Sequence, residues 1–221
     1  MPKRALAEHR PWLLASLTAS LAFYFVTRDW LPLAPVPELY LALIKGAGVG
    51  FLAVYAWVRH PERDAKVISL VMLLGALGDA LLDLFFEVGA GFFLAGHFVA
   101  SVFYLQHRRK AYRRSQIGAA VALLVATPLI SWLLTREPLV LLYSVGLGIM
   151  AATAWASRFP RYRVGIGAVL FVISDWLIFA RMGVPAMKPV ADWLVWPIYY
   201  SGQFLIATGV IQTLRRDRNR P

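Results

Sequence analysis

The sequence predicts an all-α polytopic membrane protein with eight transmembrane helices and both termini in the cytoplasm. Three observations lead to this fold class. The 221 residues are 59% hydrophobic and only 16% charged, with a mean hydropathy of +0.61, whereas an ordinary soluble domain is about a quarter charged. The apolar residues form long runs separated by short clusters of Lys and Arg. The strict alternation expected of a membrane β-barrel is absent from the sequence.

Eight runs meet the length of about 20 residues that a helix needs to cross the hydrocarbon core, some of them marginally. The first follows basic residues as a signal peptide would, but no small-x-small cleavage site follows it, and we expect a retained helix. Connections as short as Glu87–Val88 make consecutive helices antiparallel neighbours. We therefore expect a single membrane domain over residues 1–221. The predicted spans are 11–27, 37–58, 65–86, 89–106, 116–134, 138–157, 164–183 and 190–214.

The distribution of Lys and Arg predicts the orientation. Alternate connections and the two termini together hold 18 of the 23 cations, while the opposite connections hold four and Lys45 lies within a span. By the positive-inside rule, both termini are cytoplasmic in the cell (inner) membrane. The net charge of +11 therefore reflects topology. We expect residues 108–114, the densest basic run, to contact anionic headgroups and not nucleic acid.

A few ionisable and polar side chains fall inside the spans, where an ionisable group costs several kcal/mol unless it is paired or hydrated. At a rise of about 1.5 Å per residue, members of six helices lie at a similar depth, about 12 Å from the outer surface for Lys45. This agreement predicts one polar cavity that opens toward the outer leaflet. Asp83 and Glu87 continue the Asp79 face at i+4 and i+8, which predicts a hydrated rim. The residues at the common level are Lys45, Asp79, His97, Tyr143, Asp175 and Tyr199.

Each of these residues also has an ordinary structural explanation. A lone intramembrane His usually joins two helices by a hydrogen bond, Lys45 could neutralise a buried Asp, and Ser or Tyr could serve helix packing. Two Asp residues at matched depth on different helices favour function more strongly. The chain has no Cys and no HxxxH or HExxH pair, so we expect neither a metal nor a cofactor.

Four segments and Lys45, taken in order, resemble the YhhN/TMEM86 family of lysoplasmalogenases. The segments are 77–82 (LGDALL), 96–97 (GH), 167–175 (GAVLFVISD) and 199–206 (YYSGQFLI). Each is weak alone, but their order and spacing are fairly specific and cover about residues 40 to 210. The eight-span count also agrees with the family.

The resemblance implies a hydrolase that cleaves the vinyl ether bond of a lysoplasmalogen, a lysophospholipid, to a fatty aldehyde and glycerophosphoethanolamine or glycerophosphocholine. Vinyl ether hydrolysis needs a carboxylic acid to protonate carbon and a second carboxylate to stabilise the cation and activate water. We assign Asp79 and Asp175 to this pair, with Lys45 making their proton affinities unequal. The predicted substrate-binding residues are Lys45, His97, Tyr143, Ser174, Tyr199 and Gln203.

Two other functional classes fit the same intramembrane residues. A proton-coupled transporter would also use membrane Asp, His and Lys side chains, although the sequence has neither an internal repeat nor a span broken by Pro at mid-membrane. A non-catalytic lysolipid-binding protein would bind the same amphiphile without cleaving it. The sequence makes no prediction of oligomeric state.

Overall fold

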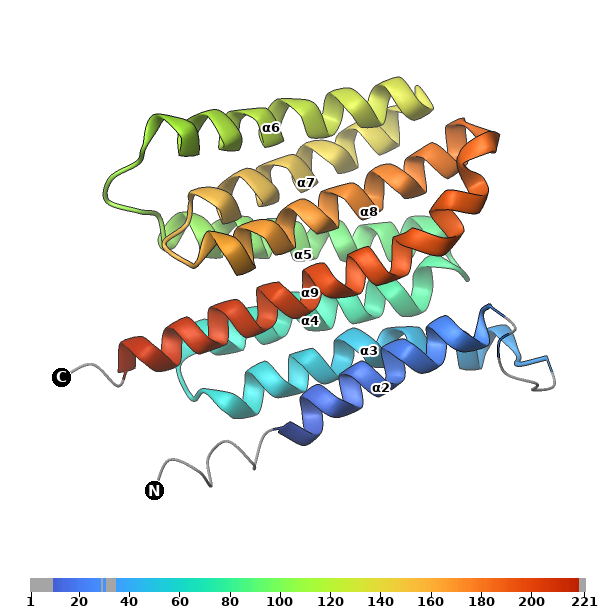
Figure 1. Ribbon diagram of the computed structural model, residues 1–221, viewed down its shortest axis with the longest axis horizontal. Coiled ribbons are helices and arrows are strands. Elements are labelled where there is room, and N and C mark those ends of the chain that lie inside the picture. The colour runs from blue at the N-terminus through green and yellow to red at the C-terminus, as the bar shows by residue number, and fades with distance from the viewer. Residues whose placement is uncertain (1–9, 29, 31–34, 219–221) are drawn as a thin grey trace. The chain divides into compact units, whose positions relative to one another are not determined.

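The computed structural model describes residues 10–28, 30 and 35–218. This part of the chain forms eight long helices and two short helical turns, joined by short connections. This part contains no β-strand, which confirms the all-α class (Figure 1). The predicted topology determinants Lys3, Arg4 and Arg220 lie outside it. The long helices are α2 (Arg10–Val26), α3 (Glu38–Arg59), α4 (Arg63–Leu82), α5 (Phe86–Gln106), α6 (Arg114–Thr135), α7 (Pro138–Ala156), α8 (Ile166–Gly183) and α9 (Lys188–Arg218). The short ones are the π-helical turn η1 (Arg161–Gly165) and the 3₁₀ turn η2 (Pro185–Met187).

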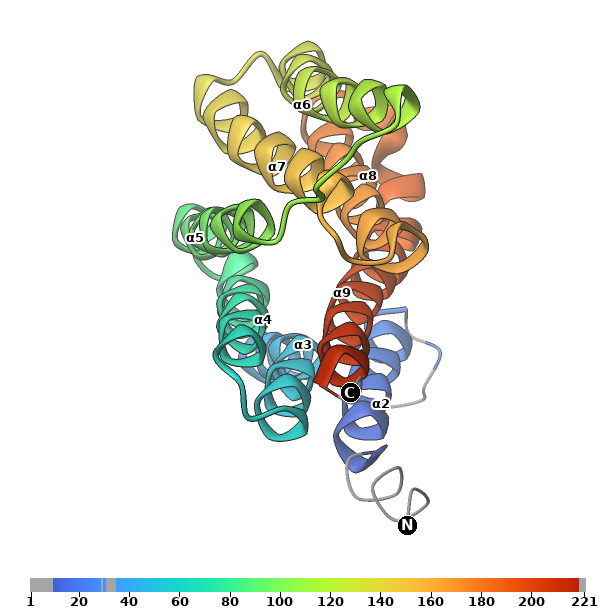
Figure 2. The ribbon, with the colours of Figure 1, turned by 90° about the vertical axis from the view of Figure 1, so that its left-hand side faces the viewer.

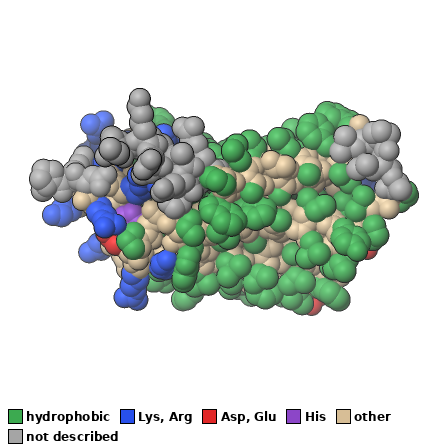
Figure 3. Space-filling view, turned by 90° about the horizontal axis from the view of Figure 1, so that it is seen from below, with side chains coloured by type: hydrophobic (Ala, Val, Ile, Leu, Met, Phe, Trp, Pro, Cys, Tyr) green, Lys and Arg blue, Asp and Glu red, His purple; other side chains and the backbone are tan. Residues whose placement is uncertain are grey.

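All eight predicted spans are helical, and seven of the described helices are long and apolar enough to cross a membrane. The remaining one, α2, has 17 residues, at the lower end of the length that spans the hydrocarbon core. On the face drawn in Figure 3, hydrophobic side chains cover most of the surface, and Lys and Arg side chains gather at one end. The chain is an integral membrane protein, and the side on which each terminus lies stays a prediction.

The boundary between the third and fourth predicted spans is wrong by four residues. Helix α4 ends at Leu82, and a turn follows in which the backbone N–H groups of Leu84 and Phe85 donate to the Leu81 carbonyl. Glu87 therefore belongs to the first turn of α5 and cannot continue the Asp79 face of α4. The turn contains neither Gly nor Pro, which is why the apolar sequence gave no local signal of it.

Helix α6 buries polar side chains and exposes apolar ones, the reverse of a helix in a soluble protein. Its buried residues are Gln116, Thr127 and Ser131, while its exposed surface is apolar. Two of the buried hydroxyls donate to carbonyls one turn earlier, Thr127 to Leu123 at 2.6 Å and Ser131 to Thr127 at 2.8 Å. Polar groups inside and apolar groups outside are the arrangement that lipid solvation favours. The exposed large residues of α6 are Ile117, Val121, Leu124, Val125, Leu129 and Leu133.

The chain divides into two compact units, unit 1 (Met1–Gly96 and Leu214–Pro221) and unit 2 (His97–Thr213). In unit 1, α3 packs against α2 and α4. The contact with α4 is close because residue 46 is Gly: a Cβ there would lie 2.9 Å from the Ala76 carbonyl oxygen. The Ser16 hydroxyl joins α2 to α3 by donating to the Gly48 carbonyl at 2.5 Å. The expectation of a single membrane domain stays a prediction.

In unit 2, α6 packs against α7 and α8, and α7 packs against α8 (Figures 1 and 2). Helices α8 and α9 cross at two glycines. A Cβ on Gly167 would lie 2.7 Å from the Gly202 carbonyl oxygen, and a Cβ on Gly202 would lie 2.7 Å from the Gly167 carbonyl oxygen. This crossing brings the C-terminal helix against the helix that carries Asp175.

Candidate active site

Helix α8 supplies the carboxyl group at the centre of the candidate site. Asp175 is only 5% exposed and lies on the same helix face as Phe171 and Phe179, one turn to either side. Both phenylalanines are also buried. Asp175 is therefore an ionisable group set in an aromatic stripe, a costly position that is met in membrane proteins mainly at functional sites.

A hydrogen-bonded chain of three side chains connects Asp175 to α7 and α5. The Tyr143 hydroxyl donates to Asp175 Oδ2 at 2.7 Å, and His97 Nε2 lies 3.1 Å from the same hydroxyl oxygen. A phenolic hydroxyl can donate one hydrogen bond and accept another. Tyr143 thus links an imidazole to a carboxyl group, and the sequence-based prediction that placed these three residues at one depth agrees with their contact.

Phe171 extends this cluster toward α9. The Phe171 ring contacts His97 edge-on at 5.0 Å between centroids and contacts Tyr199 edge-on at 5.1 Å. Gln203, one turn further along α9, donates from Nε2 to the Tyr199 hydroxyl at 3.2 Å. Two of the predicted substrate-binding residues, Tyr199 and Gln203, are therefore paired with each other beside the aromatic wall of the site.

Ser174 is oriented mainly by its own helix. Its hydroxyl donates to the Phe171 carbonyl at 2.7 Å and lies 3.5 Å from Asp175 Oδ1, a distance at the limit of a hydrogen bond. Ser174 therefore contributes little to holding the carboxyl group, and its predicted contact with substrate stays a prediction.

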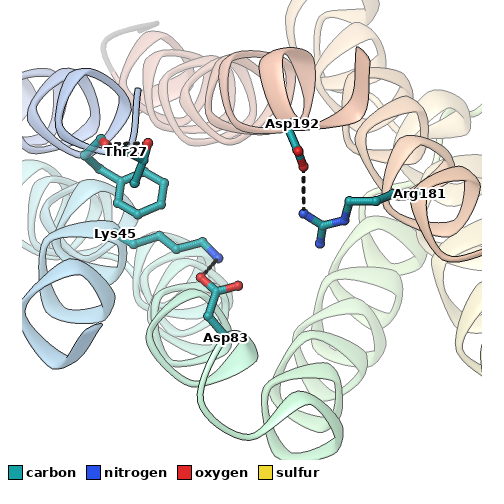
Figure 4. Close-up of polar contacts among 6 residues, drawn as sticks. Thr27, Lys45, Asp83, Arg181 and Asp192 are labelled. Atoms are coloured by element: carbon teal, nitrogen blue, oxygen red, sulfur yellow. Dashed lines mark hydrogen bonds and ion pairs between the residues drawn. The ribbon is translucent and has the colours of Figure 1, made fainter. Parts of the chain in front are cut away.

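The remaining two predicted site residues lie in unit 1. Asp79 lies on α4 and is only 2% exposed. Lys45 Nζ forms an ion pair with Asp83 Oδ2 at 2.7 Å (Figure 4). It also lies 5.8 Å from the centroid of the Phe23 ring. The Lys45 side chain is largely buried, whereas the Asp83 side chain is more than half exposed. Lys45 thus has as its ion-pair partner the residue that the sequence assigned to a hydrated rim.

A second ion pair joins α8 to α9 in unit 2, between Arg181 Nη1 and Asp192 Oδ1 at 3.3 Å (Figure 4). Both side chains are about one-third exposed or more, so this pair contributes little stability. Among the described residues, no group of three His, Asp or Glu side chains is placed to hold a metal ion.

A model of the YhhN family matches residues 40–210, which include every candidate site residue. The chain belongs to the YhhN family. It is 30% identical over 217 residues to proteins named lysoplasmalogenase from Mycobacterium bovis (strain ATCC BAA-935 / AF2122/97) and Mycobacterium tuberculosis (strain CDC 1551 / Oshkosh). Each match covers 90% of this chain and 82% of the relative. No solved structure matches this YhhN protein significantly.

The sequence-based prediction for this YhhN chain missed Phe171. Its ring contacts both His97 and Tyr199 and forms the wall between them. The signal was present in the sequence, because Phe171 precedes Asp175 by four residues and therefore lies on the same helix face. It was overlooked because Phe is ordinary in a membrane span, where an aromatic residue usually faces lipid or a neighbouring helix.

Proposed function

We propose that this protein hydrolyses the vinyl ether bond of lysoplasmalogens, with Asp79 and Asp175 as the acid–base pair. The observation that carries the proposal is the part-buried chain of hydrogen bonds from His97 through Tyr143 to Asp175. Membership of the YhhN family and the two relatives named lysoplasmalogenase support the substrate class. The substrate is a single-chain amphiphile, which suits an intramembrane site.

The first step in this proposal is protonation of carbon. The carboxyl proton of Asp175 is transferred to the alkenyl carbon that is not bonded to oxygen, and the π electrons of the double bond form the new C–H bond. The neighbouring carbon becomes an oxocarbenium ion, and Asp175 is left as a carboxylate. In this scheme Asp79 is the second carboxylate, which stabilises the developing positive charge.

Water completes the reaction. The water oxygen bonds to the oxocarbenium carbon as Asp79 accepts one of the water protons, which gives a hemiacetal. The C–O bond to glycerol then breaks as the hemiacetal hydroxyl loses its proton and the glycerol oxygen gains one. One water is consumed, and the products are a fatty aldehyde and a glycerophosphoethanolamine or glycerophosphocholine.

The Tyr143 contact suggests how Asp175 regains its proton. Because the Tyr143 hydroxyl lies within hydrogen-bond distance of both His97 and Asp175, it can accept a proton from the imidazole while it donates its own to the carboxylate. Two short transfers would then move the Nε2 proton of His97 to Asp175 without movement of a heavy atom. The cycle closes when the His97 imidazole takes a proton from water at Nδ1 and Asp79 releases to water the proton that it accepted. Tyr143 is in this scheme a relay between two groups, a role different from the substrate contact that the sequence predicted.

Aldehyde release by the purified protein from a lysoplasmalogen tests the proposal. We expect Asp79→Asn and Asp175→Asn each to lower kcat by about 100-fold or more, because acid–base groups contribute on this scale. Asp192→Asn is the matched control, since Asp192 is a partly exposed carboxylate of unit 2 in an ion pair with Arg181. It should keep the wild-type rate.

Three outcomes would contradict the proposal. Wild-type rates in both Asp variants would remove the acid–base pair from the mechanism. Uptake of a solute into proteoliposomes without any aldehyde product would favour a proton-coupled transporter. Tight lysolipid binding that survives both substitutions, again without aldehyde, would favour a non-catalytic lipid-binding protein.

A further inference from the structure

A concentration of positive charge without acidic residues distinguishes two connections of unit 2. The connection between α5 and α6, the connection between α7 and α8, and the first residue of α6 together carry eight Lys or Arg residues. The sequence has no Asp or Glu between Glu87 and Glu137, and none between Glu137 and Asp175. We call these eight residues the basic loop surface: Arg108, Arg109, Lys110, Arg113, Arg114, Arg158, Arg161 and Arg163.

Backbone contacts hold the two connections together, on the side that faces the viewer in Figure 2. Arg108 and Ser157 form an antiparallel bridge, and the Arg158 backbone N–H donates to the His107 carbonyl at 2.8 Å. Arg109 adds two bonds across the bridge, from Nε to the Ser157 carbonyl at 2.6 Å and from Nη2 to the Phe159 carbonyl at 3.0 Å. The cations are thus fixed on one bridged pair of loops and do not lie on independent flexible segments.

This arrangement weakens the proton affinity of one cation, the Arg109 guanidinium. Partial burial and the neighbouring charge of Arg161 lower the pKa of the Arg109 guanidinium. Arg109 nevertheless stays charged at neutral pH, because an arginine side chain does not lose its proton in proteins. Like charges are therefore held close together on these loops, which is unfavourable unless anions surround them.

The starts of two helices on the basic loop surface increase this need for anions. Neither α6, which begins at Arg114, nor η1, which begins at Arg161 and leads into α8, has an acidic residue in its first turn. The positive end of a helix dipole disfavours cations and favours anions. In unit 1, α4 has Asp64 in its first turn, whereas α2, like α6, has no acidic residue there.

The surface also carries aromatic side chains suited to a membrane interface. Tyr162 is 83% exposed and lies between Arg161 and Arg163, and Tyr112 is 40% exposed beside Arg113. Tyr is enriched at the depth of lipid headgroups, where its ring meets the acyl chains and its hydroxyl meets water. Loops at the ends of apolar spans lie at this depth, so the nearest anions are lipid phosphates.

We propose that the basic loop surface binds the phosphodiester headgroups of anionic phospholipids in the leaflet it faces. Selectivity follows from charge, since a phosphatidylglycerol headgroup carries a net negative charge while phosphatidylcholine neutralises its phosphate with its own ammonium group. The proposal is independent of the proposed hydrolase activity, because it concerns residues at the ends of the helices and no group of the candidate active site.

Native mass spectrometry of the full-length protein tests this binding. The protein is reconstituted in nanodiscs of equimolar phosphatidylglycerol and phosphatidylcholine, released, and the retained lipids are counted. We expect the wild type to retain more phosphatidylglycerol than phosphatidylcholine. The double variant Arg113→Gln/Arg114→Gln should lower that preference by about fivefold or more, since each cation near a membrane surface contributes a factor of this order.

Two further variants separate charge from folding. Arg113→Lys/Arg114→Lys preserves both charges and should keep the preference. Arg63→Gln/Lys66→Gln removes two cations from unit 1, where Glu62 and Asp64 already lie in the same connection, and it should also keep the preference. Equal retention of the two lipids by the wild type, or an equal loss in the unit 1 variant, would overturn the proposal.

Thermal unfolding in detergent separates lipid from free anion. Added phosphatidylglycerol should raise the melting temperature of the wild type, and inorganic phosphate at the same concentration should not. Equal stabilisation by inorganic phosphate would assign the surface to a soluble anion and overturn its assignment to membrane lipid.

Discussion

The hydroxyl group of Tyr143 connects the His97 imidazole on α5 with the Asp175 carboxyl group on α8. We expect Tyr143→Phe to lower kcat by about tenfold with little change in KM, because the variant keeps the ring and removes one hydrogen-bonding group worth about 1.5 kcal/mol. Steady-state aldehyde release over a range of lysoplasmalogen concentrations measures both constants.

Tyr162→Phe is the control for this substitution, since Tyr162 is an exposed tyrosine of η1, in the connection between α7 and α8. It should leave both constants unchanged. A rise in KM at constant kcat in Tyr143→Phe would instead identify Tyr143 as a substrate contact, which is the role that the sequence alone predicted.

Lys45 shows what could not be predicted at the residue level. The sequence placed it level with two aspartates and predicted an effect on their proton affinities. Its ion pair in unit 1 is with Asp83, at 2.7 Å. Depth along a helix gives the height of a side chain in the membrane but not its direction, and a lysine side chain is long enough to reach a residue one turn above or below its own level.

At the level of helices, the crossing of α8 and α9 depends on the absence of two side chains. A Cβ on Gly167 would lie 2.7 Å from the Gly202 carbonyl oxygen and 2.9 Å from Ile206 Cγ1. We expect Gly167→Ala to lower the free energy of unfolding by about 1–3 kcal/mol through overpacking. Thermal unfolding in detergent, followed by circular dichroism, measures the change as a lower melting temperature.

The matched control is Gly118→Ala on α6, where nothing lies within 4 Å of the added methyl group. Ala has a higher helix propensity than Gly by about 1 kcal/mol, so this variant should be as stable as the wild type or more stable. A Gly167→Ala protein that unfolds at the same temperature as the wild type would show that the helices separate without cost.

At the level of the whole molecule, the open question is which face of the membrane each connection occupies. The chain has no Cys, so single cysteines can be introduced without background labelling. The positive-inside rule predicts that Tyr162→Cys is cytoplasmic and that Glu137→Cys is outside. In intact cells, an impermeant maleimide should label the second variant and should label the first only after permeabilisation. The reverse pattern would show that the orientation is inverted.

The sequence by itself determined the class of fold and the approximate positions of the helices. All eight predicted runs are helical, because the cost of exposing backbone and polar groups to lipid acts on each segment separately and can be evaluated along the chain. The boundary error at Leu82 occurs at a turn, residues 83–85, that contains neither Gly nor Pro, so only the path of the backbone reveals it.

Only the tertiary structure decided which polar side chains meet. His97, Tyr143 and Asp175 were predicted at one depth, but the bridging position of Tyr143 depends on how α5, α7 and α8 are rotated about their axes. The same holds for the wall formed by Phe171 and for the loops joined at Arg108 and Ser157. Rotation and neighbour choice follow from close packing between helices that are distant in sequence, and that packing is set by side-chain shapes in three dimensions.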